Sequence, residues 1–121
     1  MKRILSLFLS GIMLVAAVQP LCADDGSGLS DDPRLVHIKD IYAKGTMFKE
    51  RGDAEKHRKR WGLAQKQYEH AEDYFLDCVF RYRELGEKYN IDTSNDVWIC
   101  DKMQRKMHVE VNRMRKKARR R

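Results

Sequence analysis

The chain lacks the motifs that most enzymes and membrane-spanning proteins carry. Its 121 residues contain no nucleophile elbow, phosphate-binding glycine loop or paired-histidine zinc motif. Its longest apolar stretch, from Ile4 to Val18, is shorter than the roughly 20 residues that cross a bilayer. No segment combines strand alternation with hairpin turns. These absences predict a small all-α protein that is not an enzyme and needs no cofactor, metal or small-molecule substrate.

The first 23 residues have the order of parts that is typical of a secretory signal peptide. Lys2 and Arg3 give a positive start, the apolar run follows, and Ala23 offers a small residue for cleavage before two aspartates. We therefore expect cleavage near Ala23 and a protein that is periplasmic or otherwise exported. A membrane anchor is the alternative, which the short apolar run disfavours.

The remaining chain is long enough for one domain only. Residues 24–32 are polar and rich in glycine and serine, which favours a flexible linker. A helical domain over residues 33–114 and a basic tail over 115–121 are predicted to follow. The charge is unevenly placed, because Lys102 to Arg121 contains ten Lys or Arg residues and one acidic residue, Glu110. Like-charge repulsion should fray the chain after Met114.

Apolar spacing predicts three helices. Ser30 to Pro33 has the composition of a helix start, and Gly52-Asp53 that of its end. The second helix carries an unbroken seam with alternating steps of three and four residues: Trp61, Ala64, Tyr68, Ala71, Phe75, Cys78, Tyr82, Leu85 and Tyr89. After possible caps at residues 93–96, a third stripe contains Val97, Cys100, Met103, Met107, Val111 and Met114. We predict a small three-helix antiparallel bundle.

Part of this pattern resembles a tetratricopeptide repeat. The second helix has a small residue, an aromatic four later and a small residue three after that, and the first has apolar, small and aromatic positions in matching order. The residues concerned are Ile41, Gly45, Phe48, Ala64, Tyr68, Ala71 and Phe75. The resemblance covers at most one repeat, from Asp40 to Tyr89, and the spacing from Gly45 to Ala64 is longer than in the family. It implies a helical hairpin with a C-terminal capping helix that binds proteins without catalysis. An ordinary three-helix bundle is the alternative.

The cysteines offer a possible disulfide. Cys22 leaves with the leader, so Cys78 and Cys100 remain, on the seams of consecutive helices. An oxidising compartment favours their pairing. The predicted positions of the two cysteines along the helix axes differ by only about 3 Å if the second helix ends near Gly86. This difference doubles if the helix continues to Tyr89, and a disulfide is then disfavoured. Two buried free thiols are the alternative.

The sequence thus favours an exported protein–protein interaction module of tetratricopeptide-like type. A single repeat leaves helix faces uncovered, so another protein or a second copy is the expected partner. One alternative is a holdase-like chaperone with a soft Met-rich surface. Another is a binder of anionic lipid or polysaccharide, whereas nucleic acid is disfavoured outside the cytoplasm. The basic run from Lys56 to Arg60 is interpreted as a solvated helix face. The predicted partner-binding residues are Arg113, Arg115, Lys116, Lys117, Arg119, Arg120 and Arg121.

Overall fold

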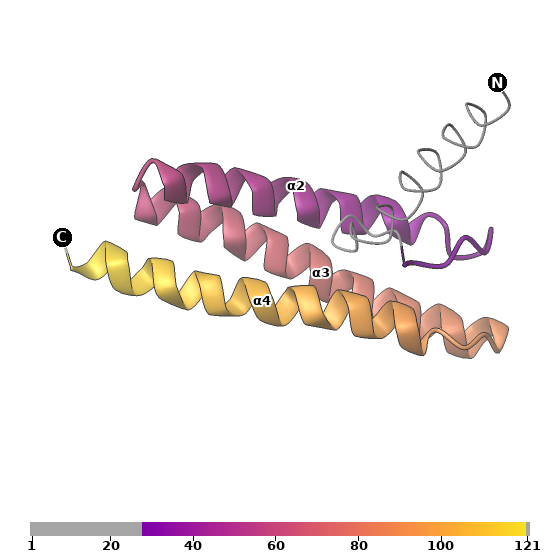
Figure 1. Cartoon of the computed structure of the whole chain (residues 1–121). Helices are drawn as coiled ribbons and strands as arrows, with labels where there is room; N and C mark the ends of the chain where they lie inside the picture. Colours follow the sequence, from indigo (N-terminus) through magenta and orange to yellow (C-terminus); the bar gives the residue numbers. More distant parts are fainter. Residues whose placement is uncertain (1–27, 121) are drawn as a thin grey trace, which may run out of the picture.

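The computed structural model describes residues 28–120, which form three long helices and the turns between them. These are α2 (Ile38–His57), α3 (Trp61–Tyr89) and α4 (Ser94–Arg119). They run antiparallel in sequence order, so that the α2–α3 turn and the C-terminal end of α4 lie at the same end of the bundle (Figure 1). The all-α, three-helix prediction is confirmed. The predicted signal peptide and Arg121 lie outside the described residues.

Helix α3 is the centre of the molecule, because α2 and α4 each pack along it and contact one another only sparsely. Every third or fourth residue of α3 faces a neighbour, as its apolar seam predicts. The stripe on α4 is equally well buried, with Cys100, Met103 and Met107 each at most 1% exposed. The core therefore consists of the seam of α3, closed on one side by α2 and on the other by α4.

Two glycines bring α2 close to α3. A Cβ atom built on Gly45 would lie 2.8 Å from the ring of Phe75, and one on Gly52 would lie 2.7 Å from the ring of Tyr68. Both distances are too short for non-bonded carbon atoms. Gly52 therefore serves close packing inside α2, and the prediction that Gly52-Asp53 ends the first helix is wrong. The helix continues to His57, and the turn comprises residues 58–60.

The predicted start of the first helix is also wrong. Residues 33–37 form successive turns, and regular helix begins only at Ile38. The Asp32 carboxylate accepts hydrogen bonds from the backbone N–H and the guanidinium of Arg34, which stabilises a local turn instead of a helix. These bonds lower the pKa of Asp32 to about 2.

The end of the predicted linker packs on the bundle instead of extending freely. Leu29 is only 4% exposed and belongs to the core. The backbone N–H of Ser30 donates to the buried carboxylate of Asp96 at 2.7 Å, and the Asn95 amide donates to the carbonyl of Gly28. Residues 28–30 are therefore held against the N-terminal end of α4, and residues 24–27 lie outside the described part of the chain.

The turn between α3 and α4 sets the register of these two helices. Helix α3 continues past Gly86 to Tyr89, where Asn90 adopts the left-handed conformation and ends it. The chain then folds back, so that Thr93 lies beside Gly86 and donates a hydrogen bond to the carbonyl of Tyr82. Helix α4 therefore begins level with Gly86, although α3 extends beyond that residue.

Among residues 28–120, no helix combines the length and the apolar composition that a membrane span requires.

Candidate functional site at the basic end of the bundle

The fold brings together two basic segments that lie far apart in the sequence. One is the α2–α3 turn, which contains Arg58, Lys59 and Arg60, and the other is the C-terminal part of α4 (Figure 1). Their contact point is Trp61, since the Lys117 ammonium lies 4.5 Å from the centre of the indole ring. This geometry makes a cation–π interaction. The basic end is defined here by Lys56, Arg58, Lys59, Arg60, Lys66, Arg113, Arg115, Lys116, Lys117, Arg119 and Arg120.

The molecule is consequently polarised along its length. The half that includes the basic end, residues 46–74 and 103–120, contains 15 Lys or Arg and 7 Asp or Glu residues. The other half, residues 28–45 and 75–102, contains 7 and 9. An exposed cluster of one sign creates a field that acts over roughly 10 Å at 0.1 M ionic strength. The basic end therefore attracts anions, and the opposite end does not.

Some of these cations are already paired. Lys56 binds Glu110 at 2.8 Å and joins α2 to α4, while Arg113 binds the same carboxylate at 3.2 Å. Burial raises the pKa of Glu110, but the hydrogen bonds and charges of Lys56 and Arg113 outweigh it and hold this pKa below its usual value. Arg115 donates to Asn112 and lies 3.9 Å from Glu69. These residues have a structural role.

Other cations at this end are exposed and have no carboxylate partner within residues 28–120. They are Lys59, Lys66, Lys116, Arg119 and Arg120. Lys116 and Arg119 lie in α4, which is regular through Arg119 and is followed by Arg120, so the predicted fraying after Met114 is wrong. Packing explains why the helix stays regular beyond Met114, because Met114 is fully buried and Lys117 contacts Trp61. The basic tail of the sequence is therefore mostly a helix surface with fixed charge positions.

Lys59 occupies a conformation that lysine disfavours. Its φ is 60°, in the left-handed region, directly after the last turn of α2. Glycine is the usual residue at this position, and a residue with a Cβ costs about 1 kcal/mol more there. Position 59 thus carries a lysine where glycine would be more stable. A local energetic cost of this kind is more common at functional positions than elsewhere.

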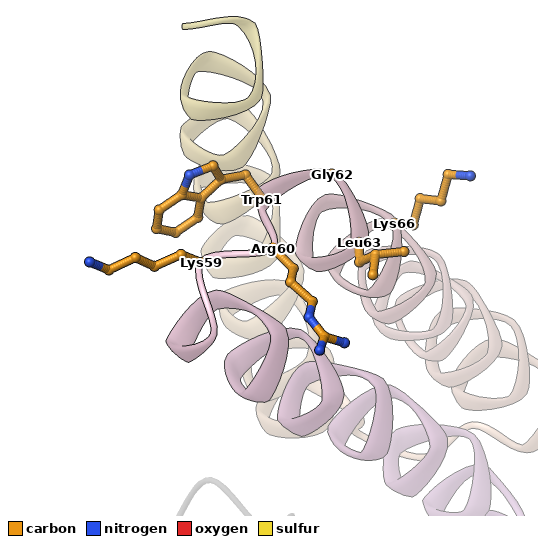
Figure 2. Close-up of a pocket in the computed structure, with 6 residues that line it drawn as sticks. All are labelled: Lys59, Arg60, Trp61, Gly62, Leu63 and Lys66. Carbon is orange, nitrogen blue, oxygen red and sulfur yellow. The ribbon is translucent and has the colours of Figure 1, made fainter. Parts of the chain in front are cut away.

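Two open hollows flank the turn, and both are lined by Lys59 and Trp61. The first, of about 450 Å³, also contacts Arg60, Gly62, Leu63 and Lys66. Figure 2 shows Lys59 and Trp61 on one side of the turn and Leu63 with Lys66 on the other. The second hollow, of about 440 Å³, is completed by Asp53, Lys56, His57 and Lys117. This end of the bundle therefore offers concave surface with both cationic and apolar side chains.

The first turn of α3 adds to the positive field. It contains no acidic residue, and no side chain in the described part of the chain caps its N-terminal N–H groups. A helix N-terminus carries a partial positive charge. The basic residues in the last turns of α2 and α4 have a second effect, since they balance the negative ends of those two helices.

The residues of the repeat-like pattern form part of the core. Gly45, Ala64, Tyr68, Ala71 and Phe75 are buried, whereas Ile41 and Phe48 are partly buried and pack against the core. Helices α2 and α3 contain 20 and 29 residues, so together they are longer than a whole repeat of about 34 residues. The extra residues lengthen α2 to His57. No family model, curated protein or solved structure matches the chain significantly, so membership of the repeat family stays a prediction.

Cys78 and Cys100 are brought together by the register of α3 and α4. Both are free, fully buried thiols in the structure. A hydrogen bond with Cys78, together with burial, raises the pKa of the Cys100 thiol. A longer α3 was expected to place the two cysteines at different heights along the helix axes. This difference does not arise although α3 reaches Tyr89, because the chain returns to the level of Gly86 before α4 begins. The two thiols are therefore close enough to interact, and a disulfide between them stays a prediction.

The role of the α2–α3 turn did not follow from the sequence. The run from Lys56 to Arg60 was interpreted as a solvated helix face, and only the antiparallel arrangement places it beside the end of α4. A usable signal was present in the sequence, since a tryptophan follows five consecutive basic residues, one of them a histidine.

Proposed function

We propose that this protein is an exported, non-enzymatic binding module that docks on an anionic macromolecular surface through its basic end. The observation that carries the proposal is the contact of Lys117 with Trp61, which joins the two basic segments into one surface. Cations on a regular helix that have no carboxylate partner among residues 28–120, and a lysine in a disfavoured turn conformation, support it. Export is inferred from residues 1–23, and the matching test is mass spectrometry of the exported protein, which should find Asp24 at the N-terminus. An intact Met1 on the exported protein would contradict this.

Lys59 permits a test that separates binding from folding. Lys59→Gly removes a charge and relieves the left-handed strain, so stability should rise by about 1 kcal/mol while affinity for a soluble polyanion such as heparin falls. Affinity is measured by calorimetry over a range of salt concentrations, because fewer ion contacts reduce the salt dependence. A reduced affinity cannot then be attributed to partial unfolding.

Two control variants lie at the opposite end of the bundle. Lys88→Gln removes an exposed charge there and should leave polyanion affinity unchanged. Asn90→Gly relieves the other left-handed residue, whose φ is 55°, without a change of charge. If Lys88→Gln weakens binding as much as Lys59→Gly does, the anion contacts are non-specific and the proposal is wrong.

A tetratricopeptide-like protein-binding scaffold is the second candidate, and a specific observation favours it. Phe80 and Trp98 are 58% and 60% exposed, so two large aromatic side chains are available for contact with a protein. A partner that binds through Phe80 would be lost in Phe80→Ser and kept in Lys59→Gly. The chaperone alternative receives less support, because Met103, Met107 and Met114 are buried and cannot form a soft surface.

A further inference from the structure

The basic end carries apolar side chains among its cations. Leu63 is 47% exposed, and Trp61 is partly buried with Lys117 over its ring. Gly62 lies between them, and no atom outside its own segment approaches within 4 Å of the position of a Cβ on it. The tip of the bundle is therefore open to solvent and not covered by other parts of the described chain.

The chemistry of the first hollow distinguishes between kinds of anionic surface. Its lining side chains are three cations, an indole and a leucine (Figure 2). An acidic polysaccharide offers charged groups to the three cations but no apolar phase for the indole and the leucine. The boundary between headgroups and acyl chains of an anionic bilayer offers both phosphates for the cations and apolar depth for Trp61 and Leu63.

We propose that the basic end docks end-on at the surface of an anionic phospholipid bilayer, with Trp61 and Leu63 inserted at the headgroup boundary. This inference rests on the proposed function and names its partner. Lys59, Lys66 and Lys117 surround the inserted side chains and contact lipid phosphates. The acidic half of the molecule, at the far end of the helices, stays in water because the surface repels it.

The two tryptophans of the chain report this orientation. Trp61 lies at the basic end, and Trp98 lies in the first turns of α4, at the other end of the bundle. They form a matched pair, since each has a lysine ammonium near its ring, Lys117 at 4.5 Å and Lys102 at 5.3 Å. Trp98→Phe and Trp61→Phe variants of the exported protein are mixed with vesicles of equal parts phosphatidylcholine and phosphatidylglycerol that contain brominated acyl chains. Fluorescence of Trp61 should shift to the blue and be quenched, and that of Trp98 should not change. Equal quenching of both, or quenching of Trp98 alone, would overturn the end-on orientation.

A second measurement tests insertion without reliance on tryptophan. Leu63→Ser should lower affinity for the anionic vesicles roughly 5- to 10-fold, because part of a leucine side chain no longer leaves water. Leu76→Ser is the matched control, since Leu76 is 38% exposed in the middle of the same helix, and it should bind as the wild type does. Vesicles of phosphatidylcholine alone should bind neither the wild type nor the variants.

The outcomes separate this inference from the proposed function. Binding to heparin that depends on Lys59, without binding to anionic vesicles, would overturn the lipid assignment and leave the proposed function standing. Binding to neither would overturn both. Vesicle binding that is unchanged in Leu63→Ser would mean that charge alone holds the protein at the surface, which overturns insertion.

Discussion

The close approach of α2 and α3 leads to a prediction in which two Gly→Ala substitutions have opposite effects. Both sites, Gly52 and Gly62, are helical. Alanine favours a helix over glycine by about 1 kcal/mol in the interior, and by less in the first turn. On helix propensity alone, both variants should therefore be more stable than the wild type.

The surroundings of Gly52 reverse this expectation. A Cβ there would lie 2.7 Å from two ring atoms of Tyr68, about 1 Å closer than contacting carbon atoms normally lie. The ring cannot retreat freely, because Tyr68 is fully buried and its hydroxyl donates to Asp53 at 2.5 Å. Overpacking of this kind costs about 1–3 kcal/mol, and disturbing the hydrogen bond to a carboxylate adds to it. Gly52→Ala should thus lose about 1–2 kcal/mol net.

Gly62 is the matched control, since no neighbouring atom lies within 4 Å of the position of its Cβ. Gly62→Ala should gain up to about 1 kcal/mol. The two variants should then differ by roughly 1–3 kcal/mol in the free energy of unfolding, or by roughly 5–20 °C in Tm for a domain of this size. Urea titration and thermal melting followed by circular dichroism measure both quantities.

A double substitution identifies the cause. Leucine at position 68 has no ring in the place of the overlap, so Gly52→Ala should be much less harmful in a Tyr68→Leu background. If Gly52→Ala is as stable as the wild type, the two helices do not approach as closely as described. If the loss is the same with leucine at position 68, the overlap with the ring is not its cause.

Three further predictions concern the core, the α2–α4 ion pair and the cysteines. Phe75→Ala should cost about 3–5 kcal/mol in urea titration, since the ring is fully buried, and wild-type stability would contradict its place in the core. The pKa of Glu110 is lowered on folding, which adds stability that is complete above the usual value of 4.5 and is lost as the pH falls through the lower folded-state pKa. Lys56→Gln removes the ion pair and should therefore flatten the acid side of the stability–pH curve. An unchanged curve would show that the pair is energetically neutral. In an oxidising compartment that supplies a disulfide or quinone oxidant, Cys78 and Cys100 should together lose two protons and two electrons and form a disulfide. The disulfide should add about 3 kcal/mol to the free energy of unfolding. Labelling of two free thiols in the native exported protein would refute this.

The class of the fold and most of its core follow from local patterns in the sequence. Helical spacing selects the buried seam from Ala64 to Tyr82 and the stripe from Cys100 to Met114 without knowledge of any tertiary contact. These predictions succeeded because the burial of one helix face leaves a periodic trace in the chain itself. The starts and ends of the helices were less predictable. A sequence does not show whether a glycine permits a turn or permits two helices to pack closely. The Gly52-Asp53 pair favoured a turn, but Gly52 lies inside α2 and serves close packing.

Which distant residues meet depends on the packing of the helices. The adjacency of Cys78 and Cys100 depends on how far the chain folds back after Tyr89, which the length of α3 alone does not give. The basic end likewise exists only because antiparallel packing returns α4 to the α2–α3 turn, where Lys117 reaches Trp61. Local patterns record which face of a helix is buried, whereas register and the convergence of charges depend on contacts between residues far apart in the chain.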